Sequence, residues 1–424
     1  MSRIDDLIAE LCPEGVEGVP LWSLTYWDKR FNAVPNSWQP EVNGHRYFLA
    51  SELKELQSPG RDIKILTTYP SDLWTTEEIV GNGFQEGEIV SIPWGGNAVV
   101  QYFSGRYVTA DNRIAIAKDS SINMKFLFYW MQAKIAVIES FYRGSGIRHP
   151  SMKKVLELQV PVPPLPVQEE IVRILDTFTE LEAELEAELE ARTKQYAVTR
   201  DRLLAFDGDR ALHPLASLIA ELCPGGVLQR TLDEVITRLR TGLNPRENFR
   251  LNTEGAFGWY VTVRELVGFD VRYQSSTDRL DSEGLRRIQE RSGLAVGDVL
   301  FSGTGTIGRT ALVTSEPLDW NIKEGVYALT PDQSQVLSRF LIYLLGSRNV
   351  LAEILLKSSG SIVKSIPFSA LRTIRVPVPP LAVQEEIVRI LDAFESLVAD
   401  ISVGLPAEIA ARRKQYEYYR DKLL

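Results

Sequence analysis

The chain has 424 residues, of which 44% are hydrophobic and 24% are charged, so it is long enough to bury a large core and form two to four domains. Its two cysteines exclude a disulfide framework, and three histidines without clustered cysteines argue against a structural zinc site. No apolar run approaches the roughly 18 residues that a membrane span needs, and Met1 is not followed by a signal-peptide pattern, so we expect a cytoplasmic protein without membrane contact.

The net charge of −9 argues against a nucleic-acid binder until its distribution is considered. Residues 160–204 and 376–424 together contain 11 basic and 18 acidic residues, so they hold most of the negative charge. The rest of the chain is close to neutral, which permits contact with DNA without indicating it.

Three stretches of the sequence occur twice in the same order, which predicts internal pseudo-symmetry. Each half runs from a short helix through an arm to a proline-rich hinge and a long helix. Cys12 and Cys223 occupy equivalent positions and are expected to be small buried hydrophobic residues. The repeated pairs are LIAELCP at 7–13 and 218–224, VPVPPLPVQEEIVRILDTF at 160–178 and VPVPPLAVQEEIVRILDAF at 376–394, and the endings ARTKQY…RDRLL at 191–204 and ARRKQY…RDKLL at 411–424.

The first arm, residues 14–159, has the pattern of a mixed α+β domain. An apolar helix is expected at 124–140, where large apolar side chains recur at helical spacing. Glycines at 95–96 and 104–105 predict turns. Strands are expected at 87–93, 107–109 and 113–117.

The hinge at 160–164, Val-Pro-Val-Pro-Pro, cannot be helical, because proline fixes φ and lacks the N–H group. The long helix is expected to begin after it, with Glu169 and Glu170 at the positive end of the helix dipole. Apolar residues then recur at intervals of three and four, as in a coiled coil. This seam comprises Ile171, Leu175, Phe178, Leu185, Leu189, Tyr196 and Leu203, interrupted by Glu182, Arg192 and Thr199.

The second arm, residues 225–375, repeats the plan with strands expected at 297–301, 311–313 and 325–329 and a helix at 340–356. The two copies of the hinge are 216 residues apart, whereas the two copies of the helix ending are 220 residues apart, so the second long helix contains four additional residues. Pro406 lies where this shift occurs, and we expect the helix to kink or restart there. The second seam comprises Ile387, Leu391, Phe394, Val398, Ile401 and Leu405.

These patterns predict an α+β fold with two globular mixed α/β domains, separated by two long antiparallel coiled-coil helices and related by a pseudo-two-fold repeat. A helix of some 35 residues is about 50 Å long, so the paired helices would hold the arms a fixed distance apart. Residues 7–13 would then dock beside the end of the second helix, with the two termini close together. The expected domains are 1–159, with the short N-terminal helix; 160–205, the first hinge and helix; 206–375; and 376–424, the second hinge and helix.

The doubled hinge-and-helix segment and the doubled ending resemble those of the specificity (S) subunits of type I restriction–modification systems. The loop GDVLFSGTGTIG at 297–308 is similar to one that is common in the target recognition domains of that family. The resemblance covers the whole chain in order and size. It implies that each arm reads one half of a bipartite, asymmetric sequence in double-stranded DNA, while the helices set the spacing between the halves.

The resemblance also implies partners. Two methyltransferase (M) subunits would dock on the helices, and restriction (R) subunits would join through them. This chain would then hold no catalytic site, metal or cofactor, whereas the partner subunits would use S-adenosylmethionine, ATP and Mg for adenine methylation and DNA cleavage. The Asn-Pro-Pro-aromatic sequence expected of an adenine methyltransferase does not occur in the chain.

Two loops in each arm are candidates for DNA contact, because they combine flexible Gly, Ser and Thr residues with cations. One follows the first strong strand of the arm and the other follows the apolar helix. The candidate residues are Trp94, Gly95, Gly96, Asn97, Arg113, Tyr142, Arg143, Ser145 and Arg148 in the first arm, and Ser302, Gly303, Thr304, Gly305, Thr306, Arg309, Lys323, Lys357, Ser359 and Lys364 in the second.

Two alternatives stay open. Residues 303–308 match the dinucleotide motif GxGxxG, which requires a helix after it, but 309–313 reads as a strand and favours a hairpin loop. The other alternative is an interaction scaffold without a DNA role, whose arms would show no salt-dependent DNA binding. The alternating glutamates of 180–190 predict a solvated face or a docking face for a basic partner, since alternate helix residues do not converge.

Overall fold

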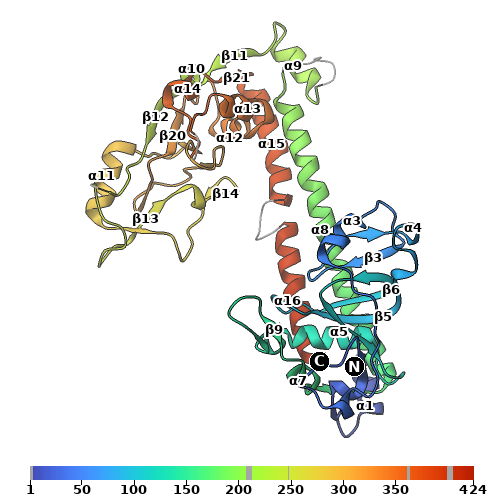
Figure 1. Cartoon of the computed structure of the whole chain (residues 1–424). Coiled ribbons are helices and arrows are strands. Elements are labelled where there is room, and N and C mark those ends of the chain that lie inside the picture. The colour runs from blue at the N-terminus through green and yellow to red at the C-terminus, as the bar shows by residue number, and fades with distance from the viewer. Residues whose placement is uncertain (1–2, 207–212, 247, 361–362, 399–403) are drawn as a thin grey trace. The chain divides into compact units, whose positions relative to one another are not determined.

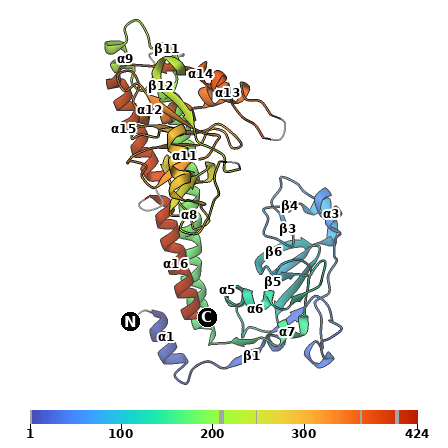
Figure 2. The same cartoon turned by 90° about the vertical axis from the view of Figure 1, so that its left-hand side faces the viewer.

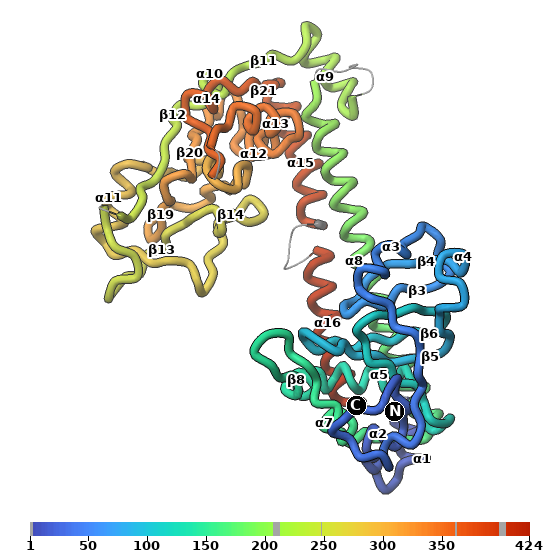
Figure 3. The backbone as a smooth tube through the Cα atoms, in the orientation of Figure 1, coloured from blue at the N-terminus to red at the C-terminus, as the bar shows by residue number. Residues whose placement is uncertain are grey.

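A computed structural model describes residues 3–206, 213–246, 248–360, 363–398 and 404–424. The chain divides into two compact units, which are described separately (Figures 1 and 3). Unit 1 comprises residues 1–184 and 410–424, and unit 2 comprises residues 185–409. Within the described ranges, no helix is both long enough and apolar enough to cross a membrane.

A six-stranded sheet forms the centre of unit 1, in the order β2-β7-β5-β6-β3-β4. All neighbouring strands are antiparallel except β3 and β6. Three of these strands confirm the sequence prediction, and helix α5 packs against β5 and β6 (Figure 1). The strands are β2 (Thr25–Trp27), β3 (Ile63–Leu66), β4 (Trp74–Thr75), β5 (Gln85–Pro93), β6 (Gln101–Thr109) and β7 (Asn112–Ala117).

The turn expected at residues 104–105 is wrong, because both lie inside β6. Gly105 pairs there with Gly87 of β5, so the two strands continue past the glycines. The apolar helix expected at 124–140 is two helices, α5 (Met124–Ala133) and α6 (Ile135–Glu139), which meet at Lys134. The other elements of the arm are α1 (Arg3–Leu11), β1 (Gly18–Pro20), α2 (Leu21–Leu24), α3 (Ala50–Glu55), α4 (Glu77–Val80), β8 (Tyr142–Arg143), β9 (His149–Pro150), α7 (Met152–Leu156) and β10 (Gln159–Pro161).

Unit 2 contains a four-stranded antiparallel sheet, β12-β20-β17-β18, and a three-stranded sheet, β16-β13-β19. The expected strands of this arm are confirmed as β17, β18 and β20. The expected helix is again two, α12 and α13, which meet at Ser347. The elements are β12 (Ile236–Thr241), β13 (Gly258–Val261), β14 (Leu266–Val267), β15 (Asp270–Val271), β16 (Arg279–Leu280), β17 (Val299–Ser302), β18 (Thr310–Leu312), β19 (Trp320–Ile322), β20 (Val326–Pro331), α9 (Ala216–Leu222), α10 (Leu232–Val235), α11 (Ser282–Ser292), α12 (Ser338–Gly346), α13 (Arg348–Leu356) and α14 (Phe368–Arg372).

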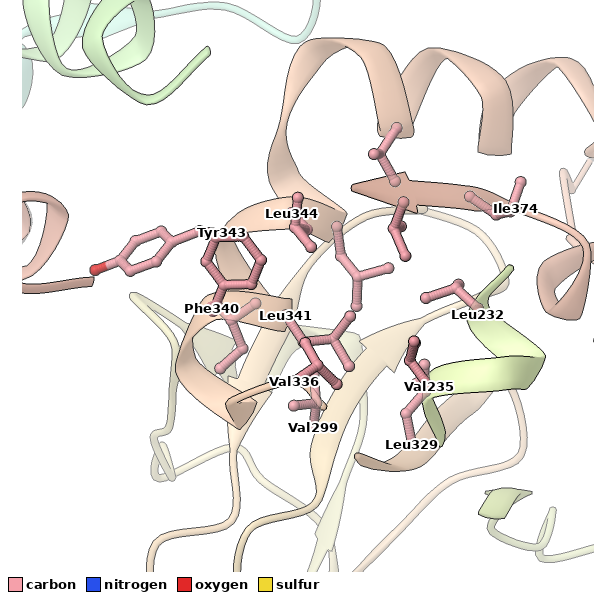
Figure 4. Close-up of a cluster of buried hydrophobic side chains, with 14 of the residues drawn as sticks. Leu232, Val235, Val299, Leu329, Val336, Phe340, Leu341, Tyr343, Leu344 and Ile374 are labelled. Atoms are coloured by element: carbon pink, nitrogen blue, oxygen red, sulfur yellow. The ribbon is translucent and has the colours of Figure 1, made fainter. Parts of the chain in front are cut away.

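The core of unit 2 forms where α12 covers the four-stranded sheet (Figure 4). Phe340, Leu341 and Leu344 of α12 are fully buried beside Val299 and Leu329 of the sheet. This burial explains why the apolar residues of that helix occur on nearly all its sides rather than in one stripe.

Both hinges are extended, as predicted. The first pairs through β10 with β1, and the second pairs through β21 (Arg375–Val378) with β11 (Leu228–Thr231). The long helices follow at once as α8 (Leu165–Leu204) and α15 (Leu381–Val398).

A buried glutamine at the start of each long helix joins the hinge to its arm. Gln168 accepts a hydrogen bond of 2.8 Å from the backbone N of Asn123 and donates to the carbonyl oxygens of Ser121 and Pro163. In unit 2, Gln384 accepts from Leu337 and donates to Gln335 and Pro379 in the same way. Both glutamines are 0% exposed, so the repeated sequence encodes a repeated attachment.

The seam of α8 is confirmed by burial, which is complete at Ile171, Leu175 and Leu203 and partial between them. In unit 1, Phe178 stacks on Tyr419 of α16 (Leu405–Leu423) at 5.4 Å between ring centroids, and Glu182 pairs with Arg413. Because the numbers rise along α8 while they fall along α16, the two helices are antiparallel there.

The second long helix restarts where the slip predicted. Helix α15 ends at Val398, and α16 begins at Leu405 with Pro406 in its first turn. Proline is tolerated in the first turn because its missing N–H would have no partner there. Ile401 of the predicted seam lies outside the described residues.

The short N-terminal helix packs where the repeat predicted. Ile4 and Leu7 of α1 belong to the same core as Leu423 and Leu424 at the end of α16, and α1 lies near the C-terminus in both views (Figures 1 and 2). In unit 2, Ile219 shares a core with the end of α8 in the same manner. Both cysteines are buried, as expected.

Candidate nucleic-acid interface

In unit 1 the two candidate loops form one surface. The turn after β5 lies against the hairpin β8–β9, where Gly96 N donates a hydrogen bond of 2.9 Å to Arg148 O. His149 Nδ1 lies 2.7 Å from the carbonyl oxygen of Trp94, and the Arg148 guanidinium donates to the Asn97 side chain. The fold therefore joins two loops that the sequence presents some 50 residues apart.

Trp94 is the half-buried aromatic centre of this surface. Phe31 stacks on it with 6.4 Å between ring centroids, and the Lys29 amine lies 4.6 Å from the ring centroid. Burial, together with the charge of Arg113, lowers the pKa of Lys29. A lysine beside a half-buried aromatic ring suits a ligand that offers both phosphate groups and bases.

Two predicted contact residues of the first arm are closed off from solvent. Arg113 is 4% exposed, and its guanidinium lies 2.8 Å from Asp28 Oδ2. Tyr142 is 5% exposed and donates to the carbonyl oxygen of Pro93. The prediction that these two residues contact DNA directly is therefore wrong. Arg113 lies beneath Trp94 and supports its ring, and Tyr142 links the hairpin to β5.

Other predicted residues of this arm remain open to solvent. Arg143 and Ser145 are exposed on the hairpin, and Arg143 forms no ion pair with any residue that the structure describes. Gly95 is partly exposed and Asn97 is exposed beside them. Arg148 is half-buried and pairs with Glu139, so it braces the hairpin.

Unit 2 joins its two candidate loops in the same way. Gly305 N donates a hydrogen bond of 2.8 Å to Lys364 O, and Ile366 N donates 2.9 Å to Gly303 O. The hydroxyl oxygens of Thr304 and Ser365 lie 3.0 Å apart.

The buried end of the 302–309 loop is structural. Ser302 is 0% exposed, donates to Thr306 O and accepts from Arg309 N. A Cβ atom at Gly303 would lie 2.0 Å from the Tyr327 ring, so only glycine fits. The prediction that Ser302 and Gly303 contact DNA directly is therefore wrong, and both residues instead hold the loop in shape. Because strand β18 follows the loop instead of a helix, the dinucleotide interpretation of 303–308 is wrong.

The remaining candidates in unit 2 divide into residues exposed on the surface and residues that line a cavity or pair with a neighbour. Gly305, Thr306, Arg309, Ser359 and Lys364 are exposed. Lys323 and Thr304 line a cavity of about 390 Å³. The Lys357 amine lies 2.8 Å from Glu353 of α13 and 3.0 Å from Thr373 Oγ1 at the end of α14, so it is held between these two helices.

The described residues contain no group of three or more potential metal ligands. The glutamates of 180–190 are exposed except Glu182, which pairs with Arg413. The sequence interpretation missed Lys29 and Phe31, since nothing in their spacing relates them to a turn more than 60 residues later.

Comparison with known proteins gives concordant matches. The sequence matches the family described as Type I restriction modification DNA specificity domain over residues 50–191 and 272–411. It is 29% identical over 323 residues to the type I restriction enzyme EcoR124I/EcoR124II specificity subunit of Escherichia coli, covering 74% of each chain. The structure resembles the S subunit of a type I restriction–modification system from M. genitalium, with a TM-score of 0.58 and 16% identity, over 96% of this chain and 95% of that one.

Proposed function

The chain belongs to the type I restriction modification DNA specificity family, and from this membership we propose that it reads a bipartite, asymmetric sequence in double-stranded DNA. Each arm would read one half of the sequence. Backbone amides and cations of the loops would hold the phosphates, and exposed side chains would reach the base edges.

One observation carries this proposal. The family match occurs twice, and within each matched arm two separate loops converge on a surface with exposed cations. The frames are nearly identical whereas the loop residues differ, with Trp94 and Asn97 in one arm and Thr304 and Thr306 in the other. Two arms that carry different loops on the same repeated framework would read the two different halves of an asymmetric DNA site.

The proposal includes an assembly role. The long helices would dock two M subunits, and R subunits would join through these. The exposed glutamates of α8 offer a face for a basic partner surface. Methylation and cleavage, with S-adenosylmethionine, ATP and Mg, would be the work of the partner subunits.

The test exchanges residues 225–375 for the corresponding arm of another family member, inside the unchanged repeated frame. The chimera and the wild-type chain are each expressed with the M subunit, and methylated adenines are mapped across the host genome. We expect one half of the site to change and the other half to stay. The reciprocal exchange of residues 14–159 is the matched control and should change only the other half.

A scaffold without a DNA role makes the opposite prediction. In that case the complex binds DNA with the same affinity whichever arm it carries, and neither exchange changes the methylated sequence. A change in both halves from one exchange would contradict the separate reading by each arm.

A further inference from the structure

Each hairpin loop carries a large aliphatic side chain that the fold leaves in solvent. Ile147 is 72% exposed in unit 1, and Val363 is 56% exposed in unit 2. A single exposed aliphatic residue is ordinary on a protein surface. Two at the same place in two otherwise unlike arms call for an explanation.

The positions are equivalent by sequence. Ile147 and Val363 are 216 residues apart, which is the offset of the repeated hinge. The same offset relates Gly144 to Gly360 and Arg148 to Lys364. The repeat therefore continues from the hinge back into the loop, although the rest of the arms shows little likeness.

The positions are also equivalent by geometry. Gly144 has φ +145° and Gly360 has φ +117°, a region that favours glycine. A Cβ atom at Gly144 would lie 2.8 Å from Ile147 O, and one at Gly360 would lie 2.2 Å from Val363 O. In each arm a glycine thus closes the turn directly beneath the aliphatic residue.

The residue after each aliphatic one is anchored to the other candidate loop. The carbonyl oxygen of Arg148 accepts from Gly96 N, and that of Lys364 accepts from Gly305 N. The same backbone hydrogen bond in both arms therefore fixes the loop next to an exposed aliphatic side chain, on the surface that carries the exposed cations. Such an arrangement suits an apolar feature of the ligand.

We propose that Ile147 and Val363 are specificity-determining residues, each contacting the C5 methyl group of a thymine in its own half-site. This rests on the proposed function. The thymine methyl is the apolar feature that base edges display in the major groove. A Cβ atom at Gly95 would come 2.8 Å from Ile147 Cγ2, so Ile147 lies along the turn. A side chain that lies along the turn in this way is placed to contact a base edge rather than to insert between stacked bases.

The experiment uses the full chain with the M subunit and duplexes of the site mapped by methylation. Each thymine is replaced in turn by uracil, which differs only in lacking the methyl group. With the wild-type chain, at least one such replacement in each half should weaken binding about fourfold, the equivalent of one buried methyl group.

The variants are Ile147→Ser and Val363→Ser. The first should abolish the difference between thymine and uracil in one half of the site only, and the second in the other half only. Leu318→Ser is the matched control, since Leu318 is 85% exposed outside these loops, and it should retain both differences. If a serine variant lowers the unfolding temperature, the asparagine variant at that position, Ile147→Asn or Val363→Asn, which fills similar space without a methyl group, is measured in its place.

The outcomes separate the inference from the function on which it rests. If the wild-type complex methylates no defined sequence, the proposed function fails. If it methylates a bipartite sequence but thymine and uracil bind alike, or if the variants keep the discrimination, the inference is overturned while the function stands. Stronger binding at an unpaired or mismatched step, with thymine and uracil bound alike, would indicate insertion between bases and also overturn it.

Discussion

The hydroxyl group of Tyr129 donates a hydrogen bond of 2.6 Å to Asp176, whose other carboxylate oxygen lies 2.7 Å from Lys125 Nζ. In unit 2, Asp392 accepts from Tyr343 and pairs with Arg339. The repeated aspartate therefore fastens the apolar helix of each arm to its own hinge helix. The two junctions use the same chemistry with different cations.

Replacing Asp176 with alanine should lower the free energy of unfolding by about 2 kcal/mol, because it leaves a partly buried hydroxyl and amine without a partner. Chemical denaturation of the full chain measures the change. Thr177→Ala is the control and should cost less than about 0.5 kcal/mol, since the equivalent position in the second repeat is Ala393. Equal effects of the two variants would contradict a role for the junction.

Gln168→Ala should cost about 2–4 kcal/mol, because it leaves the Asn123 amide and two carbonyl groups without their partner inside the core. Gln415→Ala, at an exposed position of α16, should be close to neutral. Thermal unfolding of both variants provides the comparison, and a neutral Gln168→Ala would show that the attachment does not stabilise unit 1.

Glu395 should make unit 2 less stable as the pH rises. Burial, with the nearby charges of Asp392 and Asp270, raises the pKa of Glu395 to about 7 from an ordinary value of 4.5, although Arg339 opposes the shift. The folded chain thus holds this proton more tightly than the unfolded chain does. The stabilisation is fully present below pH 4.5 and is lost as the pH rises through 7.

Glu395→Gln should therefore raise the stability by on the order of 1–2 kcal/mol at pH 8 and leave it unchanged near pH 4. Unfolding is measured across that range. Glu386→Gln is the opposing control, because Arg389 lowers the pKa of Glu386 and that variant should gain nothing at high pH. A pH profile that Glu395→Gln leaves unchanged would contradict the assignment.

Gly144→Ala should impair reading of one half-site by tenfold or more, because a left-handed residue would carry a Cβ atom against the Ile147 carbonyl group. Gly146→Ala is the control, since no atom lies within 4 Å of its added Cβ. Binding to duplexes altered in one half at a time measures both variants. If Gly146→Ala were as harmful as Gly144→Ala, backbone strain would not be the cause.

Replacing Arg143 should affect DNA binding, whereas replacing Arg113 should affect the stability of the fold. Arg143→Gln should reduce the slope of log affinity against log salt by about one without changing stability, as expected for a lost phosphate contact. Arg113→Gln should instead cost about 3–5 kcal/mol of stability, because it leaves Asp28 buried without its ion pair. Salt titrations and unfolding of both variants test this, and the reverse pattern would contradict the corrected roles.

The positions of the prolines and the spacing of the apolar residues were sufficient to predict the hinges and the long helices. The hinge prolines dictate extended backbone, the intervals of three and four dictate the seam of α8, and Pro406 dictates the restart at α16. Each of these follows from local backbone chemistry, which the sequence displays directly.

The candidate site was harder to predict, because burial depends on partners distant in the chain. Arg113 reads as an available cation until Asp28, 85 positions earlier, is found against it. The strand through Gly105 likewise depends on a neighbouring element, since Gly105 pairs with Gly87 of β5. Ile147 was not among the predicted contact residues, because a single apolar residue among serines and glycines forms no periodic pattern.

Each unit holds a single thiol at the same structural position, Cys12 at 8% exposure and Cys223 at 5%. A thiol-reactive dye reaches a buried sulfur only when the surrounding core opens. The labelling rate at each cysteine, resolved by peptide mass, therefore reports the opening of its own unit. Duplication has left this chain with two built-in probes, one for the dynamics of each half.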